Sequence, residues 1–140
     1  MTFNAARPRY TLPFAGKDYE LLGTFGLIEA VEYAMKEHVY QVAVQVVNSM
    51  SCTDLSRLVA AVLTACDHKM TSKEAFALLW DHVGMVSEEN TSLRLHIYSF
   101  LSICLAPPSH REQKAKMMGE MMGKPTSPAA SPGPSTAESA

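Results

Sequence analysis

Apolar side chains recur at helical spacing between Leu93 and Cys104, and this pattern restricts the chain to a mainly helical fold. The members of the stripe are separated by 3, 1, 3, 1 and 3 positions: Leu93, His96, Ile97, Phe100, Leu101 and Cys104. Such spacing places all of these side chains on one side of an α-helix. Similar stripes occupy residues 24–37, 51–66 and 71–83. We therefore predict a small bundle of about five short helices.

Hydroxyl residues precede each stripe and indicate where the helices begin. Thr71 and Glu74 have the spacing of a capping box, in which each side chain bonds the backbone amide of the other residue. The predicted N-caps are Thr24, either Ser51 or Thr53, Thr71 and Ser87. Gly84 and Pro107 are predicted to end two of the helices, because glycine and proline are common after a helix.

Residues 39–47 are compatible with two structures. Alternation of Val42, Val44 and Val46, together with the valine and tyrosine content, favours a strand. A helical stripe is also present, formed by Val39, Val42, Ala43, Val46 and Val47. The helices predicted on both sides favour the helical interpretation.

Residues 10–22 are predicted to form a β-hairpin. Tyr10, Leu12 and Phe14 alternate with other residues, a turn follows at 15–18, and alternation resumes with Tyr19 and Leu21. Pro13 lacks an N–H, so its strand is predicted to lie at an edge. The resulting expectation is a mainly α domain over 10–107 with an N-terminal hairpin, preceded by a flexible N-terminus at 1–9.

The C-terminal part differs from this domain in composition. Residues 109–124 are predicted to form a cationic amphipathic helix with a capping box at Ser109 and Glu112, and Pro- and Ser-rich residues 125–140 a disordered tail. Methionine side chains adapt to partners of several shapes, and the predicted helix carries Met117, Met118, Met121 and Met122. These methionines either pack onto the domain itself or bind a partner.

Composition excludes several classes of protein. A formal charge of −2 argues against a nucleic-acid binder, whose affinity depends on cations that meet phosphates. Apolar runs such as Val59–Leu63 are far shorter than the ~20 residues of a membrane helix. The start MTFNAARPRY lacks the apolar segment of a secretory signal, and three cysteines fit reduced thiols better than a disulfide framework. The predicted location is the cytoplasm.

No combination of residues forms a recognisable catalytic or metal site. Cys66 and His68 are of the types that bind zinc, but they lack paired ligand spacings and fit the C-terminus of a helix better. Asp81 and His82 could be part of a triad, although no G-x-S-x-G element accompanies them, and His96 lies on the buried stripe. We predict a protein without catalytic residues, cofactor or metal.

Two further surfaces are candidates for binding a partner. The first predicted helix carries Glu29, Glu32 and Glu37 on its outer side, which indicates either a solvated face or a binding face. Trp80 and His82 are predicted to lie at the rim of a groove. Together with the methionine-rich helix, these features are typical of a small protein-binding module.

The order of the elements resembles that of the tail assembly chaperones of long-tailed phages and gene transfer agents. Within this group the chain is most similar to the gene-transfer-agent tail family, whose members are also labelled tail tube proteins. The resemblance covers about residues 10–107 and rests on the hairpin at 10–22, on Leu27–Glu32 at the start of a helix, on Thr71–Ala75 and on Val83–Gly84. The valine-rich segment and the methionine helix depart from it.

The resemblance implies a non-enzymatic role in the cytoplasm of a bacterial host. Such chaperones bind the long apolar helix of the tape measure protein, help to recruit tail tube protein, can self-associate, and are absent from the mature particle. A ribosomal frameshift at the codons of Met122, Gly123 and Lys124 is a further hypothesis. The alternatives are a structural tail protein, either tube or minor tail subunit, and a small helical protein-binding regulator.

Overall fold

The computed structural model, which describes residues 5–121, begins with the predicted antiparallel hairpin. Strand β1, Arg9–Phe14, pairs with strand β2, Lys17–Leu22. The two-residue connection has positive φ at Ala15 (53°) and Gly16 (82°), as in the turns that match the twist of a hairpin. Alternate side chains of both strands face the core and are buried: Leu12, Phe14, Tyr19 and Leu21. The hairpin therefore contributes one apolar face to a helical domain.

Residues 5–8 are held against the domain, which differs from the flexible N-terminus predicted for 1–9. The Gly23 N–H donates to the Pro8 carbonyl at 2.8 Å, and Pro8 is buried. The Ala5 carbonyl accepts a hydrogen bond from Arg111 at 2.7 Å. These tertiary bonds join residues far apart in sequence, so local composition does not indicate them. Residues 1–4 lie outside the described part.

The first two helices are α1, Phe25–Met35, and α2, Val39–Asn48. Thr24 caps α1 as predicted, since its hydroxyl accepts from the Leu27 N–H. The Glu32 carboxylate accepts from the Val39 N–H at 2.9 Å and so satisfies the first amide of α2. The helical interpretation of 39–47 is confirmed, and one of the three glutamates predicted on the outer side of α1 has a structural role.

Helix α3, Cys52–Ala65, is capped by Ser51, whose hydroxyl accepts from the Asp54 N–H. Helix α4, Ser72–Leu78, begins with the predicted capping box, in which the Thr71 hydroxyl accepts from the Glu74 N–H at 3.0 Å and the Glu74 carboxylate accepts from the Thr71 N–H at 2.8 Å. The polypeptide then continues as a π-helical turn, η1, over Leu79–Val83. The Gly84 N–H closes this turn on the Leu79 carbonyl at 2.7 Å.

Helix α5, Glu88–Leu105, is capped by Ser87 and ends before Pro107, as predicted. Helix α6, Pro108–Met121, starts earlier than the predicted 109–124 helix. Its first residue is proline, which is favoured there because the first amides of a helix have no intrahelical partner. Ser109 consequently lies inside the first turn, and the predicted capping box with Glu112 is wrong. Met122 and the predicted disordered tail, 125–140, lie outside the described residues.

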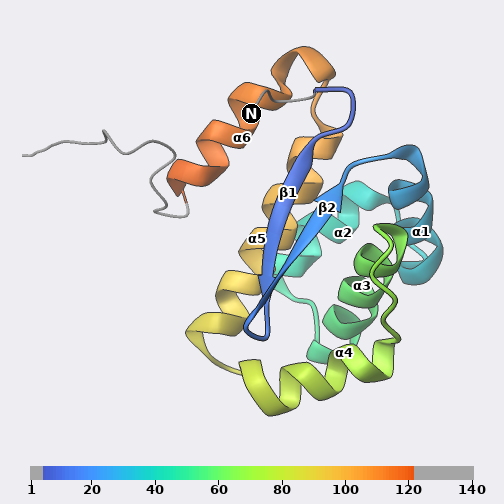
Figure 1. Cartoon of the computed structure of the whole chain (residues 1–140), viewed down its shortest axis with the longest axis vertical. Helices are drawn as coiled ribbons and strands as arrows, with labels where there is room; N and C mark the ends of the chain where they lie inside the picture. The colour runs from blue at the N-terminus through green and yellow to red at the C-terminus, as the bar shows by residue number, and fades with distance from the viewer. Residues whose placement is uncertain (1–4, 122–140) are drawn as a thin grey trace, which may run out of the picture.

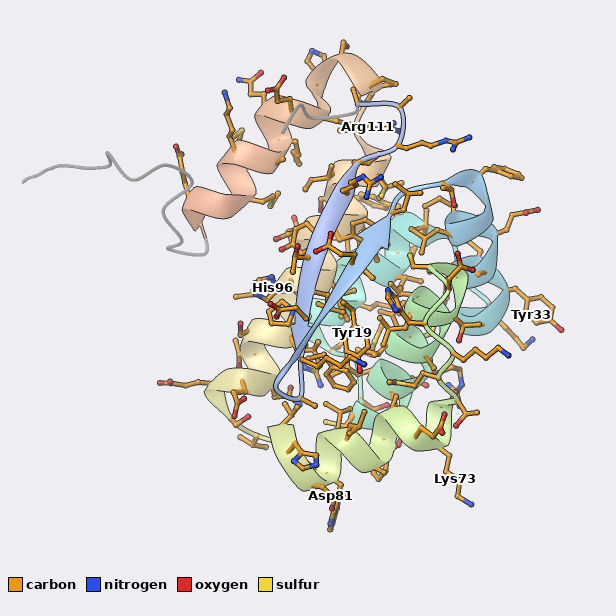
Figure 2. All side chains as sticks on the ribbon, viewed as in Figure 1. Tyr19, Tyr33, Lys73, Asp81, His96 and Arg111 are labelled. Atoms are coloured by element: carbon orange, nitrogen blue, oxygen red, sulfur yellow. The ribbon has the colours of Figure 1, made fainter. Side chains whose placement is uncertain are left out.

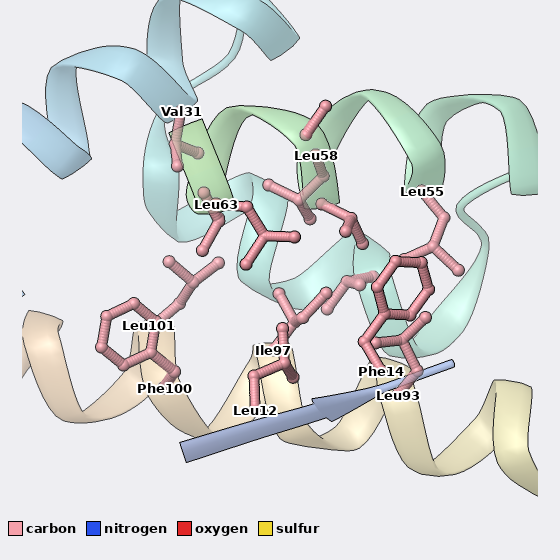
Figure 3. Packing of buried hydrophobic residues seen from close by; sticks show 14 of the residues in the cluster. Leu12, Phe14, Val31, Leu55, Leu58, Leu63, Leu93, Ile97, Phe100 and Leu101 are labelled. Carbon is pink, nitrogen blue, oxygen red and sulfur yellow. The ribbon is translucent and has the colours of Figure 1, made fainter. Parts of the chain in front are cut away.

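The core lies between the hairpin and helices α1, α2, α3 and α5 (Figure 1). Helix α5 contacts α2 along its length and β1 on another side, while α3 contacts α1 and α4. Figure 3 shows Leu12 of β1 beside Ile97 of α5, and Phe14 beside Leu93, below the leucines of α3. The predicted stripe on α5 is confirmed, since its members are buried apart from the partly buried Cys104.

Candidate partner-binding surfaces

The methionines of α6 do not form a single exposed row. Met117 is 54% exposed, whereas the adjacent Met118 is 7% exposed. Adjacent residues of an α-helix differ by about 100° in direction, so one of these side chains is directed inward and the other outward. Met118 therefore serves packing and Met117 is available to a partner. The side chain of Met121 and the whole of Met122 lie outside the described part of the chain.

One arginine fixes the start of α6 against the rest of the molecule. The Arg111 guanidinium donates to the carbonyls of Ala106, Ala5 and Cys104 at 2.8, 2.7 and 2.9 Å. Two of these carbonyls belong to the end of α5, where a cation is favourable. Arg111 is thus a structural residue, and the positive charge that α6 offers to a partner comes from Lys114 and Lys116.

Trp80 lies on the exposed side of the π-helical turn. Within the predicted stripe over 71–83, Trp80 directly follows Leu79, and adjacent residues of a helix differ by about 100° in direction. Leu79 and Val83 are buried, whereas Trp80 is 67% exposed and stacks on Phe76 with ring centroids 6.2 Å apart. His82 is also exposed. Both residues are therefore accessible to a partner, and their place at the rim of a groove stays a prediction.

The structure does not bring these two surfaces together. Helix α6 lies at one end of the molecule, and α4 with the following η1 turn lies at the other (Figure 1). In Figure 2 the labelled side chains of Arg111 and Asp81 mark these opposite ends. The methionine helix and the Trp80 surface are therefore two separate candidate surfaces.

A further surface lies on α1 and α3, where the sequence predicted the acidic side of the first helix but not a groove between the two helices. Phe25 and Tyr33 are 78% and 81% exposed on α1. Tyr33 lines a shallow groove of about 390 Å³ that runs between the two helices. Small side chains line much of it: Ala30, Ala34, Ala60, Ala61 and Ala65. Two signals in the sequence indicate this surface in retrospect, namely Gly26, Ala30 and Ala34 at four-residue spacing and the aromatic residues next to that row.

The polar residues considered for chemistry have structural partners. His96 is 3% exposed, and its Nδ1 lies 2.8 Å from the Tyr10 hydroxyl. His68 Nε2 lies 2.9 Å from the Glu20 carbonyl, and the Cys66 thiol meets the backbone of Leu22. Across residues 5–121, no group of three His, Cys, Asp or Glu side chains is close enough to bind a metal ion. These contacts assign His96, His68 and Cys66 to packing.

Burial raises the pKa of Tyr10, Cys66 and Cys104. The pKa of Tyr10 rises to about 12 because burial disfavours the phenolate, and a hydrogen bond with Ser99 opposes this effect. The pKa of Cys104 rises to about 12 and that of Cys66 also rises, in both cases mainly through burial. Both thiols therefore remain protonated at neutral pH, which is the opposite of the thiolate that a nucleophile requires.

Comparison with known proteins gives no relative on which to base a function. No protein-family model, curated protein or solved structure matches this chain. Among the helices that the structure describes, none combines the length and the apolar character needed to cross a bilayer. The functional argument therefore depends on the exposed surfaces.

Proposed function

We propose that this protein is a non-enzymatic tail assembly chaperone of the phage type. In this role it binds the tape measure protein, helps to recruit tail tube subunits in the cytoplasm of a bacterial host, and is absent from the mature particle. The resemblance over residues 10–107 suggests the family. The observation that carries the proposal is the exposure of the Trp80 indole next to the buried side chains of Leu79 and Val83.

An exposed indole of this kind is suited to binding an apolar helix. Tryptophan is among the residues most enriched at the energetic centres of protein interfaces. The Phe76 ring stacks on Trp80 and restricts its motion, so less conformational entropy is lost when a partner binds. Helical partners commonly place spaced apolar side chains against such surfaces.

A long helical partner also explains how a small surface could suffice. A tape measure protein offers many successive sites on one chain. If several copies bind side by side and also contact one another, weak individual contacts add up to a stable coat through multivalency. A small protein with one exposed tryptophan and a modest charge of −2 is adequate for this purpose.

Co-expression with the tape measure protein of the same tail gene cluster tests the proposal. We expect the native chain to keep the tape measure protein soluble and to co-purify with it. Trp80→Ala should weaken co-purification by about 30-fold, the effect of losing about 2 kcal/mol at an interface centre. Tyr40→Ala is the matched control, because this aromatic residue is 64% exposed on α2.

Two results would contradict the proposal. If the tape measure protein remains insoluble and fails to co-purify, the chaperone role is wrong. If mass spectrometry detects the protein in purified particles at the copy number of a tail subunit, it is a structural tail protein instead.

A further inference from the structure

The outer side of α4 and η1 presents an exposed aromatic surface. Phe76 and Trp80 are four positions apart, and their planes are inclined by 29° with centroids 6.2 Å apart. Trp80 is 67% exposed, Phe76 is half-buried, and Ala77 between them is exposed. The stacked pair therefore offers aromatic surface to a ligand, and the small side chain of Ala77 leaves room for that ligand to lie along the helix.

The charges around the stacked rings are of both signs. Lys73 lies three positions before Phe76, and Asp81 directly follows Trp80. Both side chains are exposed, and Figure 2 shows them at this end of the molecule, directed away from its body. Neither forms an ion pair within residues 5–121. An apolar centre between opposite charges fits an uncharged occupant better than a strongly acidic or basic one.

The chain itself contains a segment with these properties. Residues 125–137 carry no charge, and the first ten of them, PTSPAASPGP, include 4 prolines. Sequences of this composition favour the polyproline II conformation, so little further entropy is lost when they bind. Proline-rich segments are commonly recognised by exposed aromatic side chains. The segment 125–134 therefore matches the stacked rings in both polarity and conformational preference.

This segment is also long enough to extend from α6 to the rings. Helix α6 and η1 lie at opposite ends of the molecule (Figure 1), and α5, which connects them, extends about 27 Å over its 18 residues. Pro134 is 13 residues beyond Met121, or about 40 Å in the polyproline II conformation. Tethering gives the segment an effective concentration of about 1 mM, so a dissociation constant of about 1 mM already covers Trp80 half of the time.

We propose that residues 125–134 dock on the stacked rings of Phe76 and Trp80 of the same molecule. The proline rings pack against the indole and cover this surface until a partner displaces them. When Trp80 is covered half of the time, the apparent affinity for the tape measure protein is about twofold lower than for an uncovered surface. Only this consequence rests on the proposed function, because the docking itself requires no partner.

Fluorescence of the full-length chain tests the docking. Trp80 is the only tryptophan, so its emission reports on this surface alone. We expect the native protein to emit at shorter wavelength, and to be quenched by acrylamide about twofold less, than a variant without the prolines. This variant carries Pro128→Ala, Pro132→Ala and Pro134→Ala. The matched control replaces the adjacent serines and should behave as the native chain: Ser127→Ala, Ser131→Ala and Ser135→Ala.

Two results would overturn the proposal. Equal emission and quenching of the native chain and the proline variant would show that the segment does not cover Trp80. Protection that disappears on dilution would show that the segment of a second copy is bound instead, because docking within one molecule does not depend on protein concentration. Since no tape measure protein is present, this experiment can fail independently of the co-purification test, and the two failures are distinguishable.

Discussion

At the scale of single residues, Gly23 shows how closely the N-terminal segment, the hairpin and α5 approach one another. A Cβ atom at this position would lie 2.6 Å from Cys104 Sγ and 2.9 Å from Pro8 Cγ. Neither neighbour can move away easily, because Pro8 is a rigid ring and the Cys104 side chain is short and largely buried. A residue without a side chain is therefore required where the hairpin leads into α1.

Replacement of this glycine is expected to destabilise the protein. Gly23→Ala should lower the free energy of unfolding by about 1–3 kcal/mol, the usual effect of overpacking a closed site. Gly26→Ala is the matched control, since a Cβ there meets only Thr24 Oγ1 at 3.8 Å. In this helical position alanine should stabilise by up to about 1 kcal/mol. Urea unfolding of the two variants measures both values, and equal effects would contradict the account.

At the scale of secondary-structure elements, Arg94 joins two helices that adjoin in the core. Its guanidinium donates to the carbonyls of Val46 and Met50, at and just beyond the end of α2, at 3.0 and 2.6 Å. Its Nε donates to Asn90 Oδ1 at 2.8 Å within α5. A cation at the C-terminus of a helix also interacts favourably with the helix dipole. Arg94 therefore fixes the end of α2 against α5.

Removal of Arg94 should lower the free energy of unfolding more than removal of an exposed arginine. Arg94→Ala is expected to lower the free energy of unfolding by about 2 kcal/mol, because hydrogen bonds from a charged donor to partly buried carbonyls are lost. Arg57→Ala breaks an exposed ion pair with Asp54 on α3 and should cost less than about 1 kcal/mol. Thermal unfolding monitored by circular dichroism compares the two, and a larger loss for Arg57 would refute this reasoning.

The elements also differ in how far their sequences predict them. Thr24, Thr71 and Ser87 were identified as N-caps because a cap bonds amides only two or three residues away. The π-turn after α4 was missed because no local residue type specifies it. The start of α6 was placed too late because Ser109 and Glu112 have the spacing of a capping box, whereas the helix begins at Pro108.

At the scale of the whole molecule, the hairpin is attached to the helices through both apolar and polar contacts. Leu12 and Phe14 are buried against the helical core, and the Tyr10 hydroxyl meets His96 of α5 at 2.8 Å. The Tyr10 ring also lies against Phe100, with centroids 5.7 Å apart. Protonated Tyr10 is thus part of the contact between the hairpin and the helices. The stability of the molecule should therefore depend on pH in the alkaline range.

The free energy of unfolding should fall as the pH rises from about 10 to about 12. The pKa of Tyr10 is about 12 in the folded state and 10.0 when unperturbed, so the contribution is fully present below pH 10. Above pH 10, ionisation of Tyr10 lowers the free energy of the unfolded state, whereas in the folded state Tyr10 stays protonated until the pH approaches 12. The stability difference between the native chain and Tyr10→Phe should therefore shrink over this window.

Urea unfolding at successive pH values measures this difference. The pKa of Cys104 is also raised to about 12 by burial, but this thiol is present in both proteins and its effect cancels in the comparison. Tyr40→Phe, which removes a hydroxyl at an exposed position outside this contact, is the control. A difference that stays constant from pH 9 to pH 12 would refute a buried, protonated Tyr10.

The sequence by itself determined the fold class, the hairpin and most helix boundaries, because apolar periodicity, caps and turns depend on residues a few positions apart. The tertiary structure alone decided which methionine is exposed, that the Trp80 surface and α6 lie at opposite ends, and that α1 and α3 form an alanine-lined groove. The physical reason is that a surface depends on which helices pack side by side. That arrangement follows from core packing among residues far apart in the chain.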